Sequence, residues 1–274
     1  MSRSGLLIAV AVGCLALAVG LHGSATDRGW FLAVNGALWQ WLPPSALSFA
    51  TLLGHGLSAT MLMSPCLLRA PQTLAAALWS APVALVLSRL PKAAIDSPRP
   101  AAVLDAGSIH LEGMRLAAHN SFPSGHSITA FMLVAVLLCA PAVRPRWAGI
   151  VAVLLSGAAV AVSRIGVGAH WPSDVIAGAG LGLAAGVAGT ALATRWPLPP
   201  GRKARALLAL VLFAAAVLLA RVDTGYPDAR PLQWLLAALG VGVALLTLWR
   251  LRRATGPAGI DPPAAPASAG PSPR

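Results

Sequence analysis

The stretch VIAGAGLGLAAGVAGTALAT, residues 175–194, runs for twenty residues without a charge. A membrane-spanning α-helix needs about 20 predominantly apolar residues, so this stretch alone is long enough to cross a bilayer. Gly178, Gly182 and Gly186 recur in it at every fourth position. This spacing of small residues lets membrane helices approach closely. We therefore predict a membrane helix that packs tightly against a neighbour.

Further charge-poor runs lie on both sides of this one. The chain of 274 residues is 57% hydrophobic and 10% charged, whereas soluble domains carry about 25% charged residues. The other runs cover residues 6–21, 46–68, 73–88, 127–143, 147–163, 206–220 and 231–249. The pattern predicts an all-α, polytopic membrane helix bundle of eight helices. The first run could instead be a signal peptide cleaved near Gly23, but a retained helix is the favoured interpretation.

The basic residues indicate an orientation in the membrane. The net charge is +12, yet most Lys and Arg stand in short loops between apolar runs, which argues against nucleic acid as a partner. With the N-terminus inside, twelve basic residues face inward and eight outward. This bias predicts cytoplasmic N- and C-termini, with residues 92–125 and 164–174 on the outer face. The Trp-rich segment Trp30–Leu42 is too short to span and is predicted to lie at the membrane surface.

Three clusters of polar residues stand at the ends of apolar runs, all on the predicted outer side. The first, Lys92–Pro100, closes the third run, and the second, Pro123–His126, opens the fourth. The third, Ser163–Asp174, links the fifth run to the sixth. Charged residues in membrane segments commonly mark functional sites, so we expect the three clusters to meet in one site.

Lys92, Arg99 and Arg164 bring three cations to this site. Arginine presents a planar fork of donors that fits phosphate oxygens, and lysine adds a point charge. Together they suit a phosphoryl group and can stabilise the charge on its oxygens during transfer. Taken singly, each of them also fits an ordinary side chain whose charged head reaches the membrane surface.

Two histidines and one acid complete the set. His170 and Asp174 are four residues apart, so the acid can bond one imidazole nitrogen and leave the other free to attack. His126 offers a proton for a leaving group. Ser124 and Gly125 precede the fourth run, where they could hold phosphate at a helix N-terminus or serve only as a cap.

The motifs Lys-x6-Arg-Pro, Pro-Ser-Gly-His and Ser-Arg-x5-His-x3-Asp are complete and occur in this order within residues 92–174. In these motifs the chain resembles the type 2 phosphatidic acid phosphatase superfamily, which also includes vanadium haloperoxidases. The resemblance implies a six-helix phosphatase core over residues 1–194. Beyond it, residues 195–253 are predicted to form an accessory hairpin of two transmembrane helices, and the Pro-rich residues 254–274 a disordered tail.

The resemblance also implies a role for each motif residue. His170 would be the nucleophile that forms a phosphohistidine, Asp174 would orient it, and His126 would protonate the leaving group. The phosphate would be held by Lys92, Arg99, Ser124, Gly125 and Arg164. Water would then release phosphate from His170, and the reaction would need no metal and no other cofactor.

The implied function is a membrane phosphatase that acts on a lipid phosphate or diphosphate at the outer face of a bacterial inner membrane. Candidate substrates are undecaprenyl diphosphate, phosphatidylglycerophosphate, phosphatidic acid and the phosphates of lipid A. A lipid phosphotransferase would use the same intermediate, and a non-enzymatic transporter or scaffold is a further alternative. The intact motifs favour an enzyme.

Other polar residues lead to separate predictions. Asp96 is expected to balance a cation of the first cluster, and His119 to be exposed in the outer loop. His55, inside the second run, is expected to lie away from the motifs and to cap or bond a neighbouring helix. The loop Arg221–Arg230 of the accessory hairpin could help to select the substrate, or the hairpin could only anchor the protein.

Overall fold

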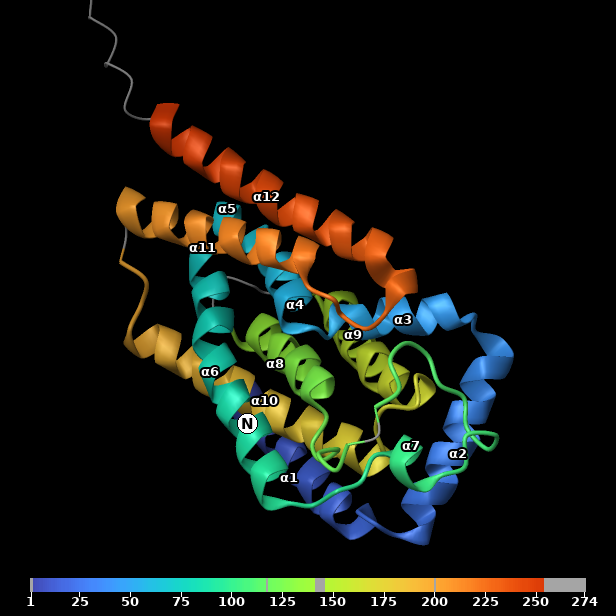
Figure 1. Cartoon of the computed structure of the whole chain (residues 1–274). Coiled ribbons are helices and arrows are strands. Elements are labelled where there is room, and N and C mark those ends of the chain that lie inside the picture. The colour runs from blue at the N-terminus through green and yellow to red at the C-terminus, as the bar shows by residue number, and fades with distance from the viewer. Residues whose placement is uncertain (1, 117, 141–145, 200, 254–274) are drawn as a thin grey trace, which may run out of the picture.

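The computed structural model describes residues 2–116, 118–140, 146–199 and 201–253, which form helices joined by loops (Figure 1). The predicted disordered tail, residues 254–274, lies outside the described residues. The all-α prediction is confirmed. In chain order the elements are α1 (Arg3–Leu21), α2 (Ala25–Trp41), α3 (Pro44–Leu53), α4 (Gly56–Met63), α5 (Cys66–Arg69), α6 (Pro71–Ala94), α7 (Pro100–Val103), α8 (Gly125–Cys139), α9 (Trp147–Gly166), α10 (Pro172–Arg195), α11 (Arg202–Arg221), the 3-10 turn η1 (Pro227–Ala229) and α12 (Arg230–Arg253).

The described residues of each predicted apolar run are largely helical, but two runs do not form one long helix, and residues 141–143 of the run 127–143 lie outside the described residues. Among the described residues, six helices are long and apolar enough to cross a membrane: α1, α6, α9, α10, α11 and, with η1, α12. The run 46–68 is bent by 70° between α3 and the α4–α5 segment, and α8 has only 15 residues. Within the described residues six helices are candidate spans, or seven with the bent pair, and the remaining one of the eight predicted helices, α8, is shorter. The apolar content of a run predicts neither where its helix bends nor how long the helix is.

Helix α10 lies at the centre of the bundle, against α1, α6 and α8. A Cβ atom at Gly178 would lie 2.6 Å from the carbonyl oxygen of Ser124. Cβ atoms at Gly182 and Gly186 would overlap the carbonyl oxygens of Ile128 and Met132. Because all three glycines face the α8 backbone, the predicted close packing is confirmed, and α8 is the neighbour.

Gly182→Ala is expected to lower the free energy of unfolding by about 1–3 kcal/mol, because the added methyl group must push α8 away from α10. Gly242→Ala in α12 is the matched control, since a Cβ there has no described atom within 4 Å. Thermal unfolding of both variants in the same detergent measures the difference. Equal melting temperatures would contradict the proposed tight contact.

The bend between α3 and α4 lies at Gly54 and places α3 next to the second motif. A Cβ at Gly54 would meet Val160 Cγ1 at 2.6 Å and His126 Cβ at 3.0 Å. Glycine is therefore required for this close approach, and the break packs directly against the start of α8. Sharp bends in helices commonly occur at such small residues.

The Trp-rich segment predicted to lie at the membrane surface forms α2, which supports the third motif from outside the bundle. Asn35 of α2 is buried, and its Nδ2 lies 3.0 Å from the carbonyl oxygens of Ile165 and Gly166. These carbonyls end α9, where a helix has no partners of its own for them. Asn35 thus fixes the turn that leads from α9 to His170.

Candidate active site

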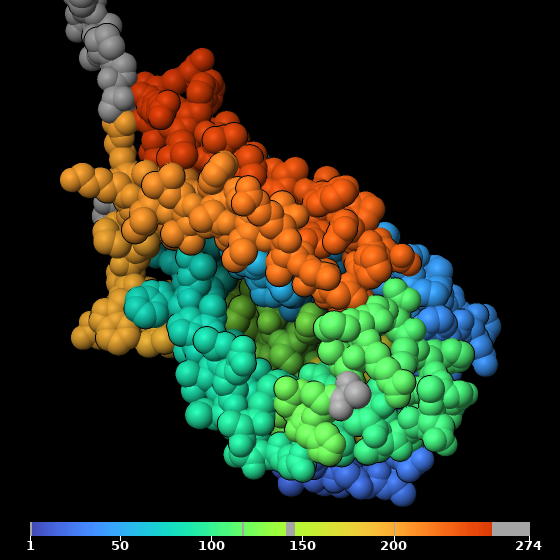
Figure 2. All heavy atoms as spheres, viewed as in Figure 1, coloured from blue at the N-terminus to red at the C-terminus, as the bar shows by residue number. Residues whose placement is uncertain are grey.

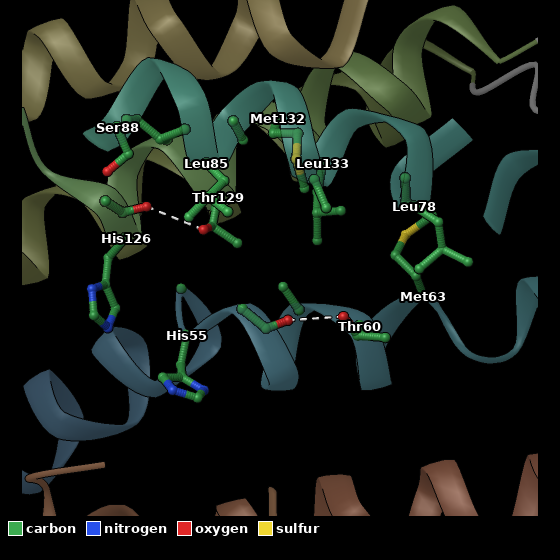
Figure 3. Close-up of a pocket in the computed structure, with 18 of the residues that line it drawn as sticks. His55, Thr60, Met63, Leu78, Leu85, Ser88, His126, Thr129, Met132 and Leu133 are labelled. Carbon is green, nitrogen blue, oxygen red and sulfur yellow. Dashed lines mark hydrogen bonds between the residues drawn. The ribbon is translucent and has the colours of Figure 1, made fainter. Parts of the chain in front are cut away.

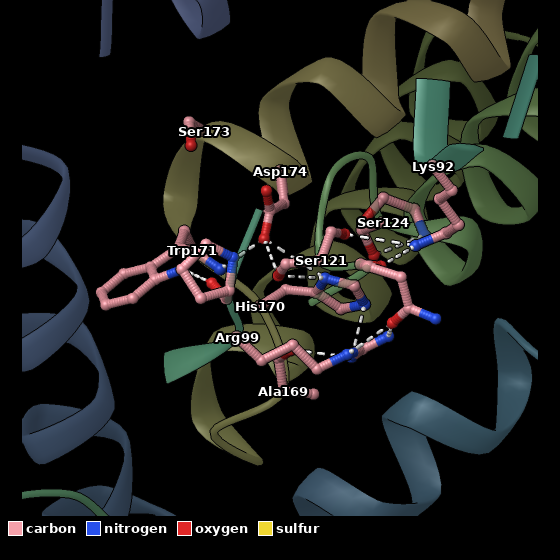
Figure 4. Close-up of polar contacts among 12 residues, drawn as sticks. Lys92, Arg99, Ser121, Ser124, Ala169, His170, Trp171, Ser173 and Asp174 are labelled. Atoms are coloured by element: carbon pink, nitrogen blue, oxygen red, sulfur yellow. Dashed lines mark hydrogen bonds and ion pairs between the residues drawn. The ribbon is translucent and has the colours of Figure 1, made fainter. Parts of the chain in front are cut away.

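The three motifs meet at one end of the bundle (Figure 4). Lys92 lies in the last turn of α6, Arg99 caps α7, and Arg164 lies in the last turn of α9. His170 occupies the turn between α9 and α10, and Asp174 the first turn of α10. Side chains from distant parts of the sequence thus gather around His170, as the sequence predicted.

His170 and Asp174 form a buried pair, with exposed fractions of 3% and 0%. His170 Nδ1 lies 3.3 Å from Asp174 Oδ2. That oxygen also accepts hydrogen bonds from the Trp171 backbone N–H at 2.9 Å and from the Ser121 hydroxyl. The carboxylate is therefore held in place independently of the histidine.

The tautomer of His170 follows from its neighbours. Arg99 Nη1 lies 3.5 Å from His170 Nε2, and a guanidinium can only donate. Nε2 is therefore the acceptor, and Nδ1 carries the proton toward Asp174. Burial, together with the positive charges of Arg99, Arg164 and Lys92, holds the pKa of His170 well below its usual value. These causes favour the neutral imidazole, whose Nε2 electron pair faces Arg99.

Two of the three cations are fixed by the loop that precedes the second motif. Arg99 donates from Nε and Nη2 to Asn120 Oδ1, both at 3.2 Å, and from Nη1 to the Ala169 carbonyl at 3.0 Å. Lys92 Nζ donates to the carbonyls of Asn120 and Ser121 at 2.6 and 3.3 Å. Asn120 and Ser121 were not among the predicted site residues, although their place shortly before the motif Pro123–His126 is a signal for them.

Arg164 is 2% exposed, and its partner comes from outside the predicted core. Its Nη1 donates to the hydroxyl of Tyr226 at 2.7 Å, while its Nε has no hydrogen-bond partner among the described residues. Tyr226 belongs to the loop between α11 and α12. Sequence analysis noted this loop but did not place it at the site.

Ser124 is an N-cap in the structure. Its hydroxyl accepts a hydrogen bond from the Ser127 backbone N–H at 3.4 Å, and its own N–H donates to the Asp174 carbonyl at 3.0 Å. Gly125 begins α8, so free backbone N–H groups are present at this end of the helix. The capping role is thus observed, while phosphate binding by Ser124 and Gly125 stays a prediction.

His126 lies one residue further along α8, beside His55, with their ring centroids 6.4 Å apart (Figure 3). The prediction that His55 lies away from the motifs is wrong. Its side chain makes no capping hydrogen bond, and its Nδ1 has no partner among the described residues. The bend at Gly54 causes this difference, since it turns the second run toward α8.

Asp96 and His119 lie at the protein surface, in the loops before and after α7. Asp96 Oδ1 is 3.0 Å from His119 Nδ1, and the two side chains are 80% and 61% exposed. The prediction that Asp96 balances a cation of the first cluster is therefore wrong, because its partner is His119. The predicted exposure of His119 is confirmed.

An apolar groove of about 340 Å³ begins at His126 and continues between α4, α6 and α8. Figure 3 shows His126 and His55 at one end, Met132 and Leu133 near the middle, and Met63 and Leu78 at the other end. Its α6 wall extends from Arg89 to Leu74, which corresponds to a length of about 22 Å. Figure 2 shows a hollow between α6 and α11, with α4 and α8 at its base.

The arrangement was compared with known proteins. Residues 72–198 match the sequence profile of the PAP2 superfamily. Over 100 residues the chain is 40% identical to a lipid A 1-phosphatase of Rhizobium etli, and this match covers 35% of the chain and 40% of the relative. The crystal structure of Aquifex aeolicus LpxE has a similar fold, with a TM-score of 0.54 and 23% identity, covering 62% of this chain and 97% of that one.

The matched segment contains all three motifs and the helices from α6 to α10 that carry them. The two C-terminal helices α11 and α12 lie beyond it. The profile match, the similarity to the Rhizobium etli protein and the similar fold all agree with the resemblance seen in the motifs. Residues 72–198 therefore carry the sequence features of the PAP2 superfamily, the type 2 phosphatidic acid phosphatases.

Proposed function

We propose that the protein is a membrane phosphatase that hydrolyses a lipid phosphate or diphosphate through a phosphohistidine at His170. The observation that carries this proposal is the buried His170–Asp174 pair, whose free Nε2 faces Arg99 at 3.5 Å. A neutral imidazole with a fixed tautomer is a competent nucleophile. The adjacent cations match the charge of a phosphoryl group.

In the first step, His170 Nε2 attacks phosphorus, and the bond between phosphorus and the lipid oxygen breaks. The negative charge of the bound phosphate favours the imidazolium form of His126, which donates its proton to that oxygen, so the lipid leaves as a neutral alcohol or a protonated phosphate. Asp174 stabilises the imidazolium that forms at His170. Lys92, Arg99 and Arg164 offset the charge on the equatorial oxygens of the transition state.

In the second step, a water molecule attacks the phosphorus of the phosphohistidine while His126 accepts one of its protons. The bond between nitrogen and phosphorus breaks, and inorganic phosphate leaves. His170 returns to the neutral tautomer that hydrogen-bonds Asp174, and His126 is again protonated. Both histidines are thus restored after one turnover.

The groove that starts at His126 supports a lipid as the substrate. Its walls are mostly apolar side chains of α4, α6 and α8, so a hydrocarbon chain can bury its surface there. A leaving group protonated by His126 has its chain at the mouth of this groove. The chemistry thus takes place where the phosphate meets the membrane boundary.

We further propose that the site faces the outer side of a bacterial inner membrane, with both termini in the cytoplasm. The distribution of basic residues supports this orientation. The similar protein of Rhizobium etli is named a lipid A 1-phosphatase, which supports lipid A phosphate as the first substrate to test. The other candidates are undecaprenyl diphosphate, phosphatidylglycerophosphate and phosphatidic acid.

The test is phosphate release by the purified full-length protein from each of these four lipids, with and without a chelator. We expect release from at least one lipid, and we expect chelator to leave the rate unchanged. Transfer of the phosphoryl group to a lipid acceptor without release would show a phosphotransferase instead. Absence of both reactions with all four lipids would contradict the proposed function.

A further inference from the structure

Tyr226 is the only tyrosine in the chain, and it lies outside the segment that matches the superfamily. It precedes η1 in the loop between α11 and α12, yet its side chain is buried, with 7% exposed. Its hydroxyl accepts the 2.7 Å hydrogen bond from Arg164 Nη1. The accessory hairpin thus contributes a side chain to the centre of the site.

The position of Tyr226 is determined by several contacts besides this hydrogen bond. It packs in one hydrophobic cluster with Leu47, Val167 and Ala169, the last of which directly precedes His170. The neighbouring Gly225 carbonyl accepts a hydrogen bond from the Met114 backbone N–H at 3.0 Å. The hairpin loop is therefore locked between α3, the outer loop and the turn of the third motif.

Gly113 of the outer loop shows how closely the hairpin approaches. A Cβ there would lie 2.7 Å from Tyr226 Cδ1, and the backbone has a φ of +75°, which favours glycine. The outer loop thus leaves space for the tyrosine ring. The hairpin contributes the ring of Tyr226 to this contact, and the loop between α7 and α8 contributes the space left by Gly113.

Arg164 needs such a partner. An arginine side chain has many rotamers. It binds phosphate more tightly when a neighbour already holds the guanidinium in the orientation that binding needs, because less conformational entropy is then lost. Among the described residues this guanidinium donates one hydrogen bond, from Nη1 to the Tyr226 hydroxyl, and its Nε has no partner. The ring of Tyr226 also lies beside the guanidinium, and Arg164 Cζ is 5.7 Å from the ring centroid.

We propose that Tyr226 is a positioning residue that orients Arg164 toward the phosphate, so that the C-terminal hairpin completes the active site. This inference rests on the proposed phosphatase function, because it assigns Arg164 to phosphate binding. It gives the hairpin a role beyond anchoring. The hairpin acts here through one hydroxyl group rather than through contact with the lipid.

The first test compares Tyr226→Phe with Thr224→Val in the full-length protein. Each removes one hydroxyl from the same loop, but the Thr224 hydroxyl bonds Gln233 at 3.3 Å and not Arg164. The probe is orthovanadate, which has the charge and shape of phosphate, and its binding is measured by calorimetry. A hydrogen bond to a charged group contributes about 1.5–3 kcal/mol, so Tyr226→Phe should weaken vanadate binding about 10- to 100-fold.

Thr224→Val should bind vanadate as the wild type does, with both variants unfolding at the wild-type temperature. Unchanged binding by Tyr226→Phe would overturn the proposal. Equal weakening in both variants would overturn it as well, because the effect would then come from the loop as a whole.

A second measurement leaves every side chain in place. Because the chain has a single tyrosine, growth with 3-fluorotyrosine puts fluorine at position 226 alone. We expect one fluorine resonance that shifts when vanadate binds beside Arg164. No shift at saturating vanadate would overturn the proposal. Since both tests follow binding and not turnover, a wild type that binds vanadate but hydrolyses no lipid would reject the phosphatase function and still decide the role of Tyr226.

Discussion

His170→Ala is expected to abolish phosphate release, with a loss of about 10⁴-fold or more in kcat. The variant lacks the nitrogen that attacks phosphorus, and the cations alone cannot replace a nucleophile. The fold should survive, because Asp174 keeps its hydrogen bonds from the Trp171 N–H and the Ser121 hydroxyl. Phosphate release from the best lipid of the panel gives the rate, and thermal unfolding in detergent checks the fold.

His119→Ala is the matched control for this experiment. His119 also pairs with an acid, Asp96, and lies in the loop between α7 and α8, but its side chain is 61% exposed. Its removal should change the rate less than about twofold, because a solvated pair contributes little. Near-normal turnover by His170→Ala would contradict the assignment of the nucleophile.

In the wild type, an acid-labile phosphoryl group on His170 should be trapped by rapid denaturation.

His126→Gln is expected to reduce turnover according to the leaving group. A general acid contributes about 10²- to 10⁴-fold, and it matters most when the departing oxygen is a strong base. The loss should therefore be large for a lipid monophosphate, which releases an alkoxide. It should be much smaller for a lipid diphosphate, which releases a phosphate. Both substrates are measured with the same protein preparation.

His55 is the natural comparison for His126, because the two rings lie 6.4 Å apart at the mouth of the groove. His55→Gln should lower both rates by the same small factor, since this residue is not assigned to proton transfer. If His55→Gln gave the dependence on the leaving group and His126→Gln did not, His55 would be the acid. Equal losses on both substrates for His126→Gln would limit its role to the shared second step, in which it accepts a proton from water, and would contradict its role as the acid for the leaving group.

Much of the fold could be predicted because membrane helices need long apolar runs, and such runs are visible in the sequence. The glycines of residues 175–194 likewise predicted tight packing, which depends only on local spacing. The bend at Gly54 could not be predicted in this way. One glycine in an apolar run has the same hydropathy whether the helix continues or turns by 70°.

The motif residues of the site could be predicted because three short patterns carry them. Their supporting residues could not, since nothing local marks them. Arg164 and Tyr226 are 62 positions apart, and Ser121 and Asp174 are 53 apart. Asn120 and Tyr226 lie in loops without periodicity, where only the tertiary structure decides which side chain meets which.

The glycine contact between α8 and α10 has a consequence for how such a protein can change its substrate. These two helices carry His126 and Asp174, and the Ser124 N–H joins their N-termini through the Asp174 carbonyl at 3.0 Å. His126 and Asp174 are thus mounted on one closely packed pair, with His170 in the turn that leads into α10, whereas α4 and α6 supply most of the groove wall. We expect relatives to diverge in lipid preference through α4 and α6 while the spacing of the chemical groups is inherited unchanged.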